Sequence, residues 1–110
     1  MDLVNELTTK LEELNVAIKK LDKSGTNYAI AERDYKVLLR QEILKLRDEG
    51  QAIGVITLIC YGIPSVAEAR FKRDVAEAMY KANQENINSI KLQIRIIESQ
   101  LQREYGSSQN

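Results

Sequence analysis

The sequence predicts an all-α protein: a long antiparallel helical hairpin, similar to a coiled coil, with a short apolar helix or turn at its tip. Three observations lead to this fold class. Apolar residues near both ends of the chain recur at alternating intervals of three and four, which is the spacing of a coiled-coil seam. Glycines and the single proline punctuate the chain between residues 50 and 64. The tracts on either side of that connector are nearly equal in length, so they match as the two arms of a hairpin.

Length and composition limit the possibilities further. A chain of 110 residues forms at most one domain with a modest core. Sixteen basic residues balance sixteen acidic ones, so no net field attracts nucleic acid or an anionic membrane. Cys60 is the only cysteine, which excludes an internal disulfide and favours a cytosolic setting. The first residues lack a signal peptide, and the longest apolar run is about half a membrane span, so we expect no membrane partner.

The first tract predicts a helix over residues 3–48. Residues 24–27 interrupt it with turn-forming types, and Gly25 costs a helix interior about 1 kcal/mol relative to alanine. The apolar stripe nevertheless stays roughly in phase across this interruption, at Tyr28, Tyr35 and Leu39. One helix, straight or kinked, is therefore expected. The alternative is a break at residues 24–27, which would give a three-helix bundle with a protruding tail.

The connector at residues 50–64 carries a concentrated apolar run, "GVITLICY". Its residue types favour a strand, but no other segment of this chain offers a strand to pair with. A short helix over about residues 55–61, closed by Gly62, is the simpler interpretation, and a strand paired with a second subunit is the alternative. The run either plugs the end of the bundle or binds a partner protein. The candidate partner-binding residues are Val55, Ile56, Leu58, Ile59 and Tyr61.

The last tract predicts a helix over residues 65–105. Pro64 suits the start of a helix, and Ser65 with Glu68 forms a capping pattern. Gly106 is a natural terminator, so residues 106–110 are expected to form a disordered tail and residues 1–105 a single helical domain. Asn83 falls within the seam, where a polar residue fixes register and partner number.

Further apolar residues lie beside the main seam of each helix, at Ile30, Val37 and Leu44 and at Leu92 and Ile96. Two helices alone cannot cover them, so we expect a homodimer or a higher oligomer. The sequence does not fix the number of copies. The predicted oligomer seam comprises Leu7, Leu11, Leu14, Ile18, Ile87, Ile90, Ile94, Ile97 and Leu101.

The sequence offers little chemistry. It contains no histidine, which removes the commonest general base and most metal sites. Cys60 lies in an apolar run, where a thiol packs more often than it reacts. Asp74 and Glu77 form one acidic pair with no matching second pair. We therefore predict no enzyme activity, no catalytic residues, no cofactor and no metal.

One row of cations departs from ordinary charge pairing. Spacing places Arg33, Lys36, Arg40 and Arg47 along one helical face, where they could contact phosphates. Neighbouring acidic residues, among them Asp34, dilute the row. A solvated face of paired charges is the alternative interpretation. Among the predicted partners, nucleic acid is therefore less expected than a second copy of the chain or a phage or host protein.

The runs "GTNYAIAERDYKVLLRQEILKLRDEG" and "YGIPSVAEARFKRDVAEAMYKANQENINSIKLQIRIIESQLQREYG" resemble a family of small proteins from phages and prophages of Gram-positive bacteria. The family has no established biochemical activity. The resemblance implies a phage protein of the host cytoplasm, expressed with early genes for replication, recombination or control of the host. It supplies no catalytic residues.

Three functional hypotheses follow. The first is a non-enzymatic, oligomeric helical adaptor or inhibitor that binds a phage or host protein. The second is an accessory protein of recombination or replication that binds nucleic acid through the cationic row. The third is a counter-defence protein that blocks a bacterial immune effector or sequesters its nucleotide signal, and this one rests on analogy.

Overall fold

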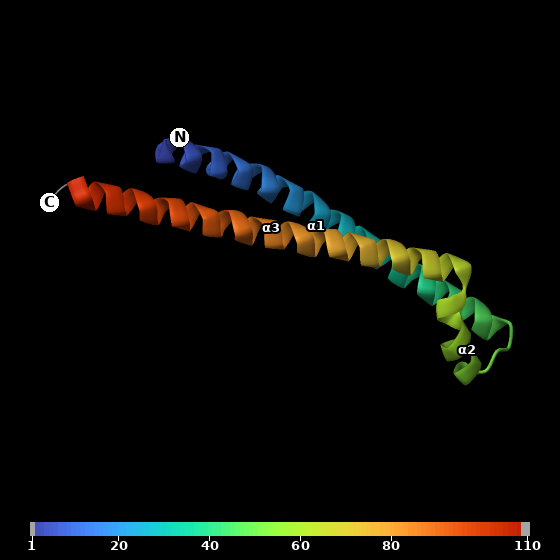
Figure 1. Ribbon diagram of the computed structural model, residues 1–110. Coiled ribbons are helices and arrows are strands. Elements are labelled where there is room, and N and C mark those ends of the chain that lie inside the picture. The colour runs from blue at the N-terminus through green and yellow to red at the C-terminus, as the bar shows by residue number, and fades with distance from the viewer. Residues whose placement is uncertain (1, 109–110) are drawn as a thin grey trace. The chain divides into compact units, whose positions relative to one another are not determined.

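The computed structural model describes residues 2–108, and nearly all of them are helical (Figure 1). The elements in chain order are α1 (Leu3–Asp48), α2 (Ile53–Ile59), the single 3₁₀ turn η1 (Cys60–Gly62) and α3 (Pro64–Ser108). No strand occurs in this part of the chain. The all-α prediction is confirmed. The connector is helical rather than extended, so the alternative of an intersubunit strand does not hold.

The first helix, α1, is unbroken through residues 24–27, so the alternative of two shorter helices is not observed. At its start the Asp2 carboxylate accepts a hydrogen bond from the Val4 backbone N–H at 3.0 Å, which caps the helix. At its end Gly50 adopts a φ of +84°. The N–H groups of Gly50 and Gln51 donate to the carbonyls of Arg47 and Leu46, the paired bonds of a Schellman motif.

Gly25 serves close packing instead of a turn. A Cβ atom at this position would lie 3.1 Å from Cε1 of Tyr80 on α3. The aromatic ring of Tyr80 occupies the space that a side chain at position 25 would need. Glycine therefore suits this position in spite of its conformational cost in a helix.

This arrangement predicts a coupling between Gly25 and Tyr80. In a Tyr80→Ala background, Gly25→Ala should raise the free energy of unfolding by about 1 kcal/mol, the usual difference in helix propensity. In the wild-type background the gain should be smaller, because the new methyl group crowds the ring. A double-mutant cycle by urea denaturation measures the difference. Equal gains in the two backgrounds would show that the ring does not constrain this position.

The last helix continues farther than expected. α3 begins at Pro64 and runs to Ser108, past Gly106, whereas the sequence led us to expect an end at residue 105 and a disordered tail after it. A Cβ atom at Gly106 would meet no other side chain or element within 4 Å, and one glycine in a terminal turn costs a long helix only about 1 kcal/mol. The expectation is therefore wrong for residues 106–108. The rest of the expected tail, residues 109–110, lies outside the described residues.

The chain divides into two compact units, and α1 and α3 contribute a segment to each. We call residues 2–23 with 81–108 the terminal unit, and residues 24–80 the central unit. In the terminal unit the two segments run antiparallel. Its core comprises Ala17, Ile87, Ile90 and Ile94, with Leu7, Leu14 and Leu21 packed against it. The Asn83 side-chain amide donates to the Lys20 carbonyl oxygen at 3.4 Å, so this half-buried polar residue does link the two helices.

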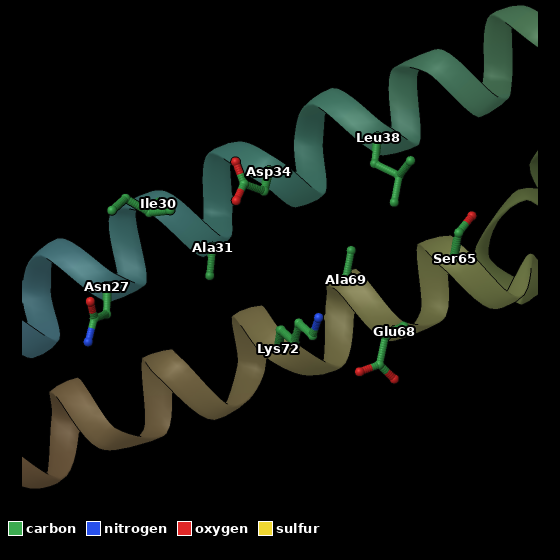
Figure 2. Close-up of a pocket in the computed structure, with 9 residues that line it drawn as sticks. All are labelled: Asn27, Ile30, Ala31, Asp34, Leu38, Ser65, Glu68, Ala69 and Lys72. Carbon is green, nitrogen blue, oxygen red and sulfur yellow. The ribbon is translucent and has the colours of Figure 1, made fainter.

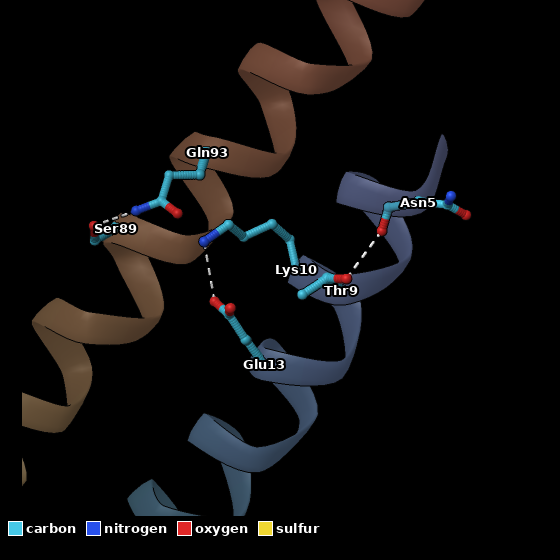
Figure 3. Close-up of polar contacts among 6 residues, drawn as sticks. All are labelled: Asn5, Thr9, Lys10, Glu13, Ser89 and Gln93. Atoms are coloured by element: carbon cyan, nitrogen blue, oxygen red, sulfur yellow. Dashed lines mark hydrogen bonds and ion pairs between the residues drawn. The ribbon is translucent and has the colours of Figure 1, made fainter. Parts of the chain in front are cut away.

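Polar contacts within each helix border this core. The Lys10 ammonium lies 3.1 Å from the Glu13 carboxylate, the Thr9 hydroxyl donates to the Asn5 carbonyl, and the Gln93 amide donates to the Ser89 hydroxyl (Figure 3). All of them link residues of one helix. Apolar packing is therefore the main interaction that pairs the two segments.

The predicted seam meets the structure differently on the two helices. On α3 the seam residues Ile87, Ile90, Ile94 and Ile97 are buried. On α1, Leu11 and Ile18 remain 45% and 47% exposed, and Ala17 takes the buried place. The two helices can approach each other closely at Ala17, because its side chain is small. Ala17 lies one position before Ile18 in the sequence, so the packed face of α1 is rotated away from Leu11 and Ile18. Seven of the nine residues of the predicted oligomer seam are therefore buried or half-buried by contacts within the chain, and only Leu11 and Ile18 remain exposed.

Candidate partner-binding surface

The segment between α1 and α3 is shaped by its backbone hydrogen bonds. After Gly50, Ala52 is extended and begins the next helix, where its carbonyl accepts the Ile56 N–H at 3.0 Å. The Thr57 hydroxyl donates a hydrogen bond to the Ile53 carbonyl oxygen at 3.0 Å, so this polar side chain finds its partner within the same helix. Ile63 is extended again, and Pro64 starts α3 with a φ already suited to a helix.

Two side chains of this segment turn inward. Ile56 is 4% exposed and Cys60 is 2% exposed, so both anchor the short helices to the rest of the central unit. A helix of seven residues is not stable alone in water, so α2 depends on this anchoring. Ile56 was predicted to contact a partner, and its burial corrects that assignment. Its side chain packs inside the central unit and holds α2 in place.

Five apolar residues of the segment face solvent, and we call them the tip patch. Leu58 is 83% exposed and Ile53, which the sequence analysis missed, is 75% exposed. A helix so short cannot bury more than one face, so the remaining large aliphatic residues project outward. The tip patch comprises Ile53, Val55, Leu58, Ile59 and Tyr61.

The tip patch has no charge of its own. No charged residue occurs from Gly50 to Ala67. The nearest cationic contact is Arg70, whose guanidinium carbon lies 5.7 Å from the centre of the Tyr61 ring at the border of the patch. Exposed apolar residues gathered in a segment without charge are typical of a protein interaction site.

Within the described residues, none of the helices taken singly is long and apolar enough to cross a membrane. The segments Ile53–Gly62 and Pro64–Gly106, which meet at a bend of 60°, satisfy the criteria of length and composition only when they are taken together.

The cationic row lies on the central part of α1, and neighbouring carboxylates compensate part of it. Arg33 binds Asp34 at 3.0 Å, and the Lys36 ammonium lies 3.4 Å from Glu32. Arg40 and Arg47 are exposed. These carboxylates offset part of the positive charge of the row, and the nucleic-acid hypothesis stays a prediction.

A cluster of aromatic and charged side chains joins α1 to α3 in the central unit. The rings of Tyr28 and Tyr80 lie 6.0 Å apart between centroids. The guanidinium of Arg73 stacks 4.7 Å over the Tyr35 ring, 2.9 Å from Asp74 and 3.8 Å from Glu32. The hydrogen bond to Asp74 raises the pKa of Arg73, so its charge is fixed. Sequence reasoning placed Tyr28 and Tyr35 in the apolar stripe but did not identify the cluster.

The cluster predicts an alkaline dependence of stability. Desolvation, and then the charges of Glu77 and Glu32, raise the pKa of Tyr28 above its usual value of 10. Because the folded state holds this proton more tightly, the contribution of Tyr28 is complete below pH 10 and is lost as the pH rises through the raised pKa. We expect the free energy of unfolding to fall less steeply above pH 10 in Tyr28→Phe than in the wild type. Identical slopes in urea titrations would contradict the assignment.

A groove of about 460 Å³ runs between the two helices of the central unit. Ala31, Leu38 and Ala69 point into the space between the helices, whereas Glu68 points away from α1 (Figure 2). A similar groove of about 430 Å³ lies in the terminal unit, between Glu6 and Ile97 among others. Both are shallow and apolar at their base, which suits a side chain of another polypeptide better than a polar ligand.

In the described part of the chain, no group of three or more histidine, cysteine, aspartate or glutamate residues is placed to hold a metal ion. No family model, curated protein or solved structure matches the sequence or the fold.

Proposed function

We propose that this protein works by binding other polypeptides, as a non-enzymatic helical adaptor or inhibitor. The observation that carries the proposal is the tip patch, where Ile53 and Leu58 are more than 70% exposed in a segment without charge. Keeping such residues in water is unfavourable by about 25 cal/mol per Å², so a partner that covers them gains binding energy. The patch offers no nucleophile and no acid–base pair.

We also propose that α1 and α3 form one antiparallel hairpin and that copies of it associate. The antiparallel pairing of the α1 and α3 segments within the terminal unit supports the first part. The exposed apolar residues beside each seam support the second, because two helices leave them uncovered. On α1 and α3 these include Val4, Leu11, Ile18, Leu92 and Ile96.

The biological setting is proposed from the resemblance alone. It places the protein in the cytoplasm of an infected Gram-positive bacterium, where the partner would belong to the phage replication machinery or to the host. Early expression with replication or host-takeover genes would suit an adaptor that needs no catalytic site.

The proposal is tested by affinity capture from phage-infected cells with three baits. They are the wild type, the tip variant Ile53→Asp with Leu58→Asp, and a control with the same added charge on exposed positions of α3, Ser99→Asp with Gln102→Asp. We expect a defined protein to be recovered with the wild type and the control and to be lost with the tip variant. Recovery of nothing beyond the bait, or equal recovery with all three baits, would refute the role of the tip patch.

A further inference from the structure

An apolar stripe runs along the outer side of α1 in the central unit. Ile30, Val37 and Leu44 are 42%, 50% and 48% exposed, and each lies seven positions after the one before it. Residues seven apart on an α-helix differ by only about 20° in direction, so the three side chains share one face. Most of this face lies away from the seam with α3, whose buried residue in the middle of this segment is Tyr35. Ile30 also borders the groove beside that seam, together with Asp34.

The two edges of the stripe carry different residue types. Each apolar residue is followed three positions later by arginine and four positions later by aspartate or glutamine. At about 100° per residue, the arginine lies about 60° to one side of the stripe and the aspartate or glutamine about 40° to the other. The arginine edge is Arg33, Arg40 and Arg47. The opposite edge, which we call the acidic edge although its middle residue is neutral, is Asp34, Gln41 and Asp48.

The members of both edges are accessible. The side chains of Arg33 and Asp34 are 68% and 60% exposed, although they bind each other at 3.0 Å within the chain. Arg40, Gln41, Arg47 and Asp48 are also exposed. A partner can therefore form additional charged contacts along both edges without displacing a buried group.

We propose that this stripe is the contact between two copies of the chain, with their α1 helices parallel and in register. In a parallel pair related by a twofold axis along the helices, the arginine edge of one copy faces the acidic edge of the other. In an antiparallel pair like edges meet, so Arg33 of one copy would approach Arg40 of the other. Charge complementarity in two of the three heptads, with the neutral Gln41 amide available to an arginine in the third, therefore selects the parallel arrangement. This inference rests on the self-association proposed above and names its surface.

The same pattern explains the cationic row without nucleic acid. Arg33, Arg40 and Arg47 form one border of an apolar stripe, and a phosphate backbone lying along them would meet Asp34 and Asp48 on the other side of that stripe. It would also leave Val37 in water. Salt-dependent binding to DNA is thus an outcome that the test must exclude.

Disulfide crosslinking tests the orientation of the copies. In a Cys60→Ala background, Ile30→Cys and Leu44→Cys should each form a covalent homodimer on mild oxidation, because parallel copies bring each position to its own equivalent. Ala29→Cys is the matched control, since this exposed neighbour lies about 100° away around the helix and should not crosslink. Crosslinking only in a mixture of the Ile30→Cys and Leu44→Cys chains would show antiparallel copies and overturn the inference.

Charge reversal tests the edges. A variant with Arg33→Glu, Arg40→Glu and Arg47→Glu is acidic on both edges, and one with Asp34→Arg, Gln41→Arg and Asp48→Arg is basic on both. Each should self-associate about tenfold or more weakly than the wild type in sedimentation equilibrium, and an equimolar mixture should recover the mass of a dimer. All substitutions are at exposed positions, and circular dichroism verifies that the helices persist.

The failures of the two proposals are distinguishable. A wild-type chain that is monomeric throughout would refute self-association altogether. A wild-type oligomer that withstands both charge variants and does not crosslink at residues 30 and 44 would refute this surface while leaving self-association intact. The DNA outcome would be a salt-dependent gel shift that Arg40→Glu with Arg47→Glu abolishes, while the oligomeric mass in solution stays unchanged. That result would assign the row to nucleic acid.

Discussion

Replacing Ile90 by alanine is expected to lower the free energy of unfolding by about 2–4 kcal/mol, the usual cost of removing a large buried aliphatic side chain. Ile90 is 6% exposed and belongs to the core of the terminal unit, where Ala17 of the opposite helix leaves little material to refill the cavity. For a chain of this size the midpoint of thermal unfolding should fall by about 10–20 °C. Circular dichroism at 222 nm, at one fixed protein concentration, measures both quantities.

Leu92→Ala provides the matched control on the same helix. Leu92 is 55% exposed, so alanine removes little buried surface and improves helix propensity slightly. We expect a change of less than about 0.5 kcal/mol at a concentration where the chain is dissociated. An equal loss for Leu92→Ala and Ile90→Ala would contradict the packing of the terminal unit.

Replacing Ile56 by alanine is expected to release the tip without unfolding the rest of the chain. Ile56 and Cys60 are the buried residues of α2 and η1, and seven helical residues have no independent stability. The local loss of about 2–4 kcal/mol should raise amide hydrogen exchange across residues 53–62 by about thirtyfold or more. The exchange of core amides near Ile90 should be unchanged.

Leu58→Ala tests the same helix from its outer side. Its side chain is 83% exposed, so the substitution should leave hydrogen exchange at the tip unaffected and weaken only the binding of a partner. Fast exchange at the tip in the wild type, or equal effects of the two substitutions, would show that Ile56 does not anchor the segment.

The periodicity of apolar residues was sufficient to predict the long helices, because a stripe at intervals of three and four is stable only when it is buried against another helix. It did not give the phase of the seam on α1. Leu11 and Ile18 are larger and more apolar than Ala17, yet Ala17 is buried because its small side chain permits the close approach of α3. Similarly, Gly25 suggested a break, whereas the Tyr80 ring fills the space beside it.

The candidate surface was predictable in position but not in detail. A dense apolar run without charge indicated the tip, yet which of its side chains point inward depends on how α2 docks. Ile56 was therefore wrongly assigned to the surface, and Ile53 was missed. The cluster around Arg73 joins residues that are distant in sequence, and only tertiary packing reveals it. The arginines of α1 suggested phosphate contacts, and the exposure of the apolar residues beside them adds a second interpretation that the sequence did not offer.

The central claim is that the apolar side chains left uncovered by one chain are covered by other polypeptides, beginning with a second copy. Molar mass by light scattering, from about 1 µM to 1 mM protein, tests it most directly. We predict a mass that rises with concentration to twice the 12.5 kDa of the chain or a higher multiple. A constant 12.5 kDa over the whole range, with the helices intact by circular dichroism, would contradict the account.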